Sequence, residues 1–177
     1  EEWKQKRLNW HLALGLGQEN YKFHDHEKLA HYANAAADIE FKFPFGFKEL
    51  EGMHSRTDFD ITKKKKFSGR KLQYFDPERN ENYVPYVVET SIGLDRMFLA
   101  LFSNCLKDEV LEDGSERTVL SLPPALAPVK AAILPLVKKD GLPEFAEKIF
   151  NDLKYDFNVI SEEKDSIGKR YRRQDAI

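Results

Sequence analysis

The strongest candidate site of the chain lies at residues 88–96, where an extended segment meets an apolar helix. Glu89 places a carboxylate at the end of the extended segment, Ser91 and Gly93 form the turn, and Arg96 follows in the helix. A glycine at this turn lets a flat ligand approach the backbone closely. The planar guanidinium of Arg96 suits a phosphate group. Together these residues predict a site for a polyphosphate beside a small polar or cationic substrate.

A second acidic pair lies upstream in a segment of period two. Glu49 and Glu51 are two residues apart, so a regular strand would point both carboxylates to one face, about 7 Å apart. Glu89 on a neighbouring strand could join them. The alternative is structural, because two such carboxylates can line a solvated sheet face, and a Glu before a helical Arg can be a surface salt bridge.

The spacing of apolar residues predicts the helices that would support these side chains. We expect helices over residues 1–14, 27–38 (as a helix or an irregular helical turn), 91–106 and 142–153, with a helix or loop over 167–177. Ser91 is a plausible N-cap of the third helix. Its predicted apolar stripe is Leu94, Met97, Phe98, Leu101 and Cys105.

Extended structure is expected between these helices. The predicted strands are residues 21–23, 41–56, 83–89, 129–137 and 156–160. Pro44 and Gly46 should distort the second of them, so its clean portion should begin near Phe47. Residues 58–82 are polar and predict a loop or hairpin insertion. Pro123 and Pro124 place a domain boundary near Leu122, and the pattern beyond it predicts a β-α-β unit with a parallel strand pair.

Composition limits the functions that the chain can have. The 177 residues are 41% hydrophobic with a net charge of -2, so binding of nucleic acid would need a local basic patch. The single cysteine, Cys105, excludes a disulfide framework and predicts a cytoplasmic protein. No apolar run approaches the roughly 18 residues of a membrane span. The chain begins without Met and stops abruptly, which we interpret as two cut ends.

Three segments resemble one family in the right order. The run Glu89-Thr90-Ser91-Ile92-Gly93-Leu94-Asp95-Arg96 resembles motif 3 of class II aminoacyl-tRNA synthetases, in the form found in glycyl-tRNA synthetases. Residues 43–60 are similar to that family's pattern almost throughout. Residues 126–130 and 167–175 resemble the opening strand and the basic segment of its anticodon-binding domain.

The resemblance implies a fold and a division of the chain. Residues 1–122 would be the C-terminal part of a class II catalytic domain, an α+β antiparallel sheet with helices. Residues 123–177 would be a truncated α/β anticodon-binding domain. It also implies roles for individual residues. The substrate glycine would be bound by Glu89, Thr90, Ser91, Ile92 and Gly93, with the carboxylate facing its ammonium group. ATP would be bound by Glu49, Leu50, Gly93, Leu94, Asp95 and Arg96, with Glu51 and Arg56 as further candidates. The tRNA would be bound by Lys169, Arg170, Arg172 and Arg173.

The resemblance implies the chemistry of a whole enzyme. Such an enzyme activates glycine with ATP, assisted by Mg²⁺, and transfers the glycyl group to tRNA(Gly). It would be a homodimer and would not bind a membrane. No catalytic nucleophile is evident, so catalysis would depend on positioning and electrostatics. Motifs 1 and 2 are not found, and we therefore expect the chain alone to be inactive.

Other interpretations remain open from the residues. The chain could be a non-catalytic RNA-binding fragment or a synthetase-like accessory protein, or belong to a synthetase for histidine, proline or threonine. His24, His26 and His31 lack the spacing of strong zinc sites, so we predict no metal site and a solvated or hydrogen-bonded role for them. The four lysines at residues 63–66 predict a solvated loop tip.

Overall fold

The computed structural model describes residues 1–177. Contacts divide them into two compact units, Glu1–Ala100 and Leu101–Ile177, and the division falls inside α3 (Leu94–Cys105). Each unit is described by itself. The domain boundary near Leu122 stays a prediction. No helix combines the length and apolar composition needed to cross a membrane.

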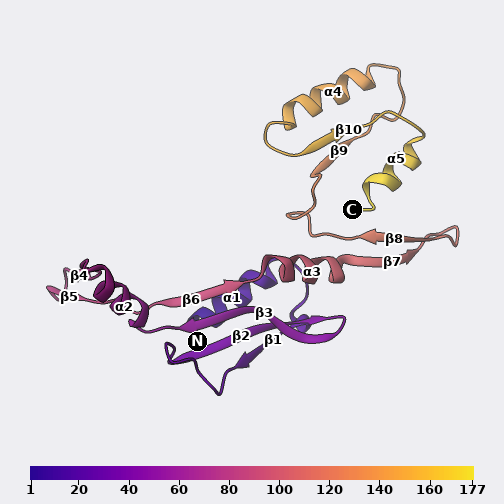
Figure 1. Ribbon diagram of the computed structural model, residues 1–177. Coiled ribbons are helices and arrows are strands. Elements are labelled where there is room, and N and C mark those ends of the chain that lie inside the picture. The colour runs from indigo at the N-terminus through magenta and orange to yellow at the C-terminus, as the bar shows by residue number, and fades with distance from the viewer. The chain divides into compact units, whose positions relative to one another are not determined.

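The first unit is built on a four-stranded antiparallel sheet in the order β1-β2-β3-β6 (Figure 1). Its strands are β1 (Tyr21–Asp25), β2 (Ala35–Phe43), β3 (Gly46–Ser55) and β6 (Val88–Ile92). The segment predicted as one distorted strand is therefore a hairpin. Pro44 and Phe45 form its turn, and Gly46 follows with a φ of 101°, a backbone conformation that favours glycine.

One face of this sheet is covered by α1 (Glu2–Leu12), which was predicted, and η1 (Gln18–Asn20) follows the helix. Ile39, Phe41, Leu50 and Met53 are buried in the core on this side of the sheet. Ring contacts continue the core from His11 on α1 through Tyr21 to Phe41, with centroids 5.3 and 5.2 Å apart. The antiparallel sheet with flanking helices agrees with the predicted architecture of this part.

Three expectations for this unit are wrong in whole or in part. Residues 27–38 form turns and the start of β2 rather than a helix, because Ala35 to Phe43 pair with strands on both sides. Residues 58–82 do contain the expected hairpin, formed by β4 (Tyr74–Asp76) and β5 (Glu81–Tyr83), but a helix that was not expected, α2 (Phe59–Ser68), precedes it. The four lysines at residues 63–66 therefore lie on a helix and not at a loop tip. The strand predicted over residues 83–89 is shorter at its start, because residues 84–87 lie outside β6. Ser91 lies inside β6 and is therefore not a helix N-cap.

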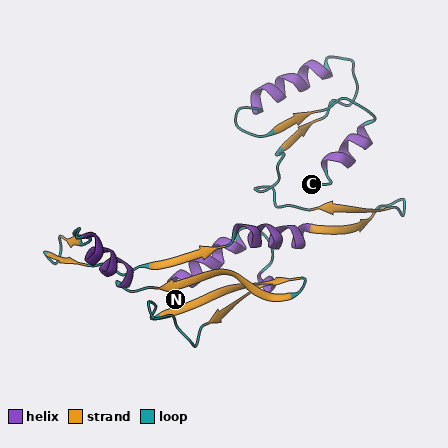
Figure 2. Ribbon diagram, viewed as in Figure 1, coloured by secondary structure: helices purple, strands orange, loops and turns teal.

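The second unit contains a hairpin and a β-α-β unit (Figure 2). The hairpin joins β7 (Leu106–Val110) to β8 (Glu116–Leu120), with its turn at residues 113–115. Beyond it β9 (Ala131–Ile133) and β10 (Val159–Ser161) pair in parallel, with α4 (Leu142–Leu153) between them, as predicted. The last helix is α5 (Ile167–Gln174).

Of the predicted α3 stripe, Met97 and Cys105 are buried but Leu94 and Phe98 are exposed.

Candidate functional site

The face of the sheet opposite α1 holds several of the candidate site residues of the first unit. In an antiparallel sheet, residues directly opposite one another lie on the same face. Gly52 lies opposite Ser91, and His54 lies opposite Glu89. The side chains of Glu89 and Ser91 therefore share the face of Gly52, which we call the open face.

Gly52 leaves a space in the floor of the open face. A Cβ atom at this position would lie 3.4 Å from His54 Cε1, 3.5 Å from Asp38 Oδ1 and 3.9 Å from Glu49 Oε1. Glu49 is therefore on the same face as Gly52 and close to it. A glycine in a strand interior often marks a place where a ligand or another backbone approaches closely.

Glu49 and Arg96, both predicted to bind ATP, are brought together here. Arg96 Nη1 donates a hydrogen bond of 2.8 Å to the Glu49 carbonyl oxygen and lies 3.4 Å from Glu49 Oε2. Both side chains are about half exposed, so the guanidinium keeps donors for an anion. Arg96 reaches β3 because it lies in the first turn of α3, directly after β6 and Gly93.

Glu51 lies on the other face, and the expectation that it points the same way as Glu49 is wrong. It is fully buried, and His11 Nε2 and Arg7 Nε donate hydrogen bonds to it at 2.7 and 2.5 Å. The register with β2 shifts at Leu50, so a β-bulge separates the two glutamates. Burial opposes ionisation of Glu51, but the hydrogen bonds from His11 and Arg7 outweigh it and hold its pKa below the ordinary value.

Thr90 and Ile92 also lie away from the open face, since they pair with Met53 and Glu51. Only their backbone atoms could reach a ligand there. Leu50 is buried, which leaves its backbone as the part that could contact a nucleotide. Leu94 and Asp95 are exposed at the start of α3.

Arg56, the residue after β3, bonds to the side chain of Glu89 on β6. Its Nη1 donates a hydrogen bond to Glu89 Oε2, while Nε and Nη2 donate to the carboxylate of Asp60 at 2.5 and 3.2 Å. Asp60 was not singled out from the sequence. Its position four residues after Arg56 is the spacing of an ion pair on a helix, which was the available signal.

The histidines near this face have hydrogen-bonded roles where contacts define them. His26 Nε2 lies 2.8 Å from Asp38 Oδ2, in agreement with the interpretation made from the sequence. No group of three or more His, Cys, Asp or Glu side chains is arranged to hold a metal ion. Cys105 is buried, and this burial raises the pKa of its thiol.

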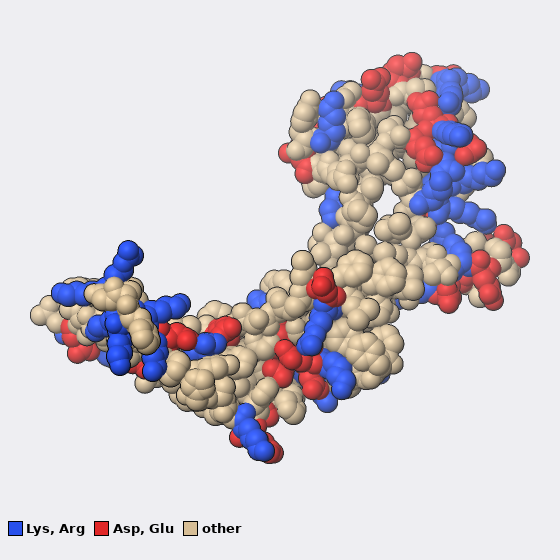
Figure 3. All heavy atoms as spheres, viewed as in Figure 1, with Lys and Arg blue, Asp and Glu red and all other residues tan.

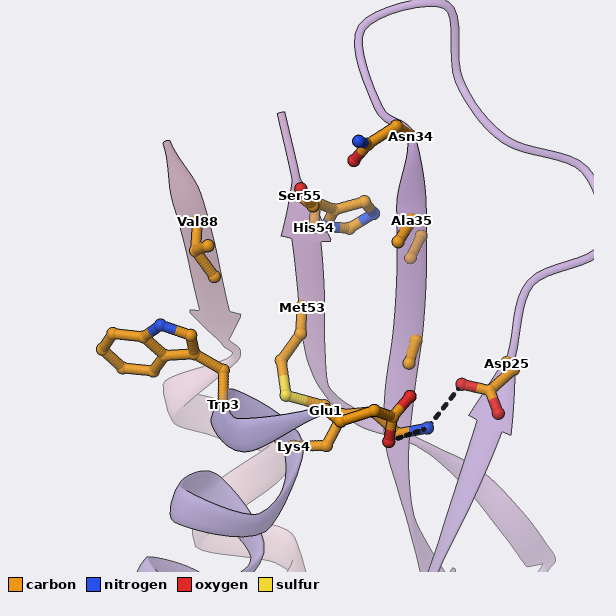
Figure 4. A pocket seen from close by; sticks show the side chains of 12 residues that line it. Glu1, Trp3, Lys4, Asp25, Asn34, Ala35, Met53, His54, Ser55 and Val88 are labelled. Atoms are coloured by element: carbon orange, nitrogen blue, oxygen red, sulfur yellow. Dashed lines mark hydrogen bonds and ion pairs between the residues drawn. The ribbon is translucent and has the colours of Figure 1, made fainter. Parts of the chain in front are cut away.

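A second hollow, of about 380 Å³, lies on the α1 side of the sheet (Figure 4). Ala35, Met53 and Val88 line it, with the indole of Trp3 beside them. Lys4 Nζ closes one end through contacts with Asp25 and Glu1 at 2.8 and 3.5 Å. Its mainly apolar lining contrasts with the open face, where carboxylates, a hydroxyl and an arginine converge.

The basic segment of the second unit divides into one buried and three exposed cations. Arg170 is buried and donates hydrogen bonds to the carbonyl oxygens of Pro135, Glu162 and Leu136 at 2.7, 3.0 and 3.4 Å. Lys169, Arg172 and Arg173 are exposed on α5.

Both exposed arginines of this segment are paired with acids. Arg172 contacts Asp113 at 3.3 Å, and Arg173 contacts Glu162 and Asp165 at 2.5 and 3.1 Å. Figure 3 accordingly shows basic and acidic atoms interspersed near α5.

Comparison with known proteins identifies the family. The chain is 51% identical over 178 residues to a glycine–tRNA ligase of Chlorobaculum tepidum, and 49% and 50% identical to those of Borrelia hermsii and Geobacillus kaustophilus. These matches cover 99–100% of the chain. The chain belongs to the glycine–tRNA ligase family. It spans 38–40% of the length of these relatives.

A solved structure shares the fold of this member of the glycine–tRNA ligase family. A Giardia lamblia prolyl-tRNA synthetase, solved in complex with prolyl-adenylate, superposes with a TM-score of 0.50 at 18% identity. The match covers 96% of this chain and 35% of that one. No protein-family model matches the chain. The identity to glycine–tRNA ligases confirms the family resemblance expected from the three sequence motifs.

Proposed function

We propose that the protein to which this chain belongs activates glycine with ATP to glycyl-adenylate and transfers the glycyl group to tRNA(Gly). The proposal is supported chiefly by about 50% identity to glycine–tRNA ligases over the whole chain. The geometry adds that Glu89, Ser91, Glu49 and Arg96 lie close together at the open face of the sheet.

The glycine site would be formed by Glu89 and Ser91 above Gly52. The carboxylate of Glu89 would accept hydrogen bonds from the substrate ammonium, and the Ser91 hydroxyl offers a donor or acceptor beside it. Thr90, Ile92 and Gly93 would contribute backbone atoms. Because glycine has no side chain, selection would depend on the limited space over Gly52 between its flanking side chains.

The ATP site would lie at the β3–α3 side of the same face. Arg96 would contact phosphate, the backbone of Glu49 and Leu50 would lie along the nucleotide, and Gly93, Leu94 and Asp95 would border it. Mg²⁺ commonly binds through one or two carboxylates together with substrate phosphates. Glu49 is the carboxylate placed to take that part, and the ion would neutralise phosphate charge there.

The tRNA site of the second unit is proposed on the exposed face of α5. Lys169 is exposed and Arg172 and Arg173 border it, while Tyr171, also exposed, is available to stack on a base. Arg170 is left out because its guanidinium is committed to three carbonyl groups. The β-α-β unit before α5 would belong to an anticodon-binding domain, in a cytoplasmic and homodimeric enzyme.

The test is glycine-dependent ATP–pyrophosphate exchange by the full-length protein, followed by aminoacylation of tRNA(Gly). Glu89→Gln should raise the KM for glycine by at least roughly tenfold, since charge-assisted hydrogen bonds are lost. Glu78→Gln, an exposed glutamate in the β4–β5 turn, is the matched control. Exchange that is absent with glycine, or that prefers another amino acid, would contradict the proposal and favour an RNA-binding or accessory role.

A further inference from the structure

Glu89 is already paired with a cation before any substrate arrives. Arg56 Nη1 donates a hydrogen bond to its Oε2, and the Glu89 side chain remains 39% exposed. A carboxylate whose charge is cancelled by an arginine attracts an ammonium group weakly. A further negative group beside Arg56 would remove this difficulty.

Asp60 is that negative group. Its two carboxylate oxygens accept hydrogen bonds from Arg56 Nε and Nη2 at 2.5 and 3.2 Å, a bidentate arrangement that is strong and directional. The hydrogen bonds lower the pKa of Asp60 and raise that of Arg56, so both are ionised at neutral pH. Two carboxylates and one guanidinium leave the trio with one net negative charge.

The trio is held in place from several directions. The guanidinium carbon of Arg56 lies 4.1 Å from the centre of the Tyr32 ring. The backbone N–H of Arg56 donates to the Val87 carbonyl, and that of Val87 donates to the Thr57 carbonyl, at 2.8 and 2.9 Å. These two bonds fix the backbone of Arg56 to Val87, the residue just before β6 begins. A fixed Arg56 fixes the direction of the Glu89 carboxylate.

All three guanidinium nitrogens of Arg56 are engaged with carboxylates. Few N–H groups remain for an anion, which argues against the direct contact with ATP considered from the sequence. Arg96, by contrast, is 55% exposed and keeps free donors.

We propose that Arg56 and Asp60 are positioning residues for binding of the amino acid substrate. Arg56 orients Glu89, and Asp60 neutralises Arg56 so that Glu89 keeps its attraction for an ammonium group. Neither residue touches substrate or nucleotide. The inference rests on the proposed glycine site at Glu89.

The test compares Asp60→Asn with Asp58→Asn in the full-length enzyme. Both substitutions remove one acidic charge at the start of α2, but Asp58 bonds to Thr62 and not to Arg56. Asp60→Asn should raise the KM for glycine roughly tenfold, the lower end for a lost charge-assisted interaction. The KM for ATP should change by less than about twofold in both variants, as should the KM for glycine in Asp58→Asn.

Arg56→Lys is the second variant, and it carries the test if Asp60→Asn fails to fold. Lysine keeps the charge but lacks the planar fork that bonds two carboxylates at once. The KM for glycine should again rise with little change in the KM for ATP. A purely structural role would instead lower the active fraction, and thus apparent kcat, at unchanged KM.

The outcomes separate the two proposals. If the wild type shows glycine-dependent exchange but Asp60→Asn has the same KM for glycine as Asp58→Asn, the inference is overturned and the proposed function stands. A rise in the KM for ATP alone also overturns it, because the residues would then serve the nucleotide. A wild type without glycine-dependent exchange removes the proposed function and this inference together.

Discussion

Glu49 and Glu51 are two residues apart on β3 but lie on opposite faces of its sheet. The register places Glu51 opposite Ile39 and Glu49 opposite Glu40, so Leu50 is an extra residue on β3. One extra residue inverts the alternation of side chains along the strand. The bulge thereby sends one glutamate into the core under α1 and the other toward the proposed nucleotide.

Replacing Glu51 should destabilise the fold. Glu51→Gln leaves the buried His11 and the largely buried Arg7 without their charged partner, and breaking a buried ion pair costs about 3–5 kcal/mol. We expect the free energy of unfolding, measured by urea denaturation, to fall by about 3 kcal/mol, the lower end of this range, because Gln retains one hydrogen-bond acceptor. Glu49→Gln should change stability by under about 1 kcal/mol, since its pair with Arg96 is solvent-exposed. Equal losses in the two variants would contradict this.

The same glutamate should make stability depend on acid. The folded-state pKa of Glu51 lies below the ordinary value of 4.5, so the unfolded chain binds a proton first as pH falls. Its contribution is therefore present above about pH 4.5 and is lost progressively below it. Denaturation midpoints measured from pH 7 to pH 3 should fall less steeply for Glu51→Gln than for wild type. An unchanged slope would show that Glu51 does not titrate in this range.

The sequence predicted elements best where one periodicity was uninterrupted. The amphipathic pattern of residues 142–153 gave α4 with its observed bounds, and the two apolar runs around it gave the parallel pair β9 and β10. The helical spacing of apolar residues over 27–38 misled, because residues 35–38 already belong to β2 and its pairing with β1 and β3 outweighs that local pattern.

Parts of the site depended on contacts that no local pattern specifies. Ser91 was expected in a turn, and only its pairing with β3 shows that it shares a strand face with Glu89. The bulge at Leu50 likewise leaves no signal in composition. Among four nearby cations in residues 169–173, only the packing of α5 determines that Arg170 is the buried one. Charge patterns indicate how many cations are available, whereas burial decides which of them can meet a ligand.

Gly52 should limit the space for substrate rather than support the fold. A Cβ atom here would meet its neighbours at 3.4–3.9 Å, which is ordinary contact, so Gly52→Ala should fold. The methyl group would project over the proposed glycine site, and overpacking of this kind costs about 1–3 kcal/mol. We expect the KM for glycine to rise at least roughly fivefold, with a melting temperature close to that of wild type. An unchanged KM would place the substrate elsewhere on the open face.

Arg170 and Lys169 should separate stability from RNA binding in the second unit. Arg170→Ala removes a buried guanidinium from three carbonyl groups. The unpaired acceptors should cost about 3 kcal/mol in denaturant unfolding. Lys169→Ala alters an exposed side chain and should leave stability within about 0.5 kcal/mol. If α5 contacts tRNA, Lys169→Ala should weaken tRNA binding. The slope of the logarithm of the binding constant against the logarithm of the salt concentration should then fall by about one. Stable Arg170→Ala protein with the same loss of tRNA affinity would instead assign Arg170 to the RNA and contradict its structural role.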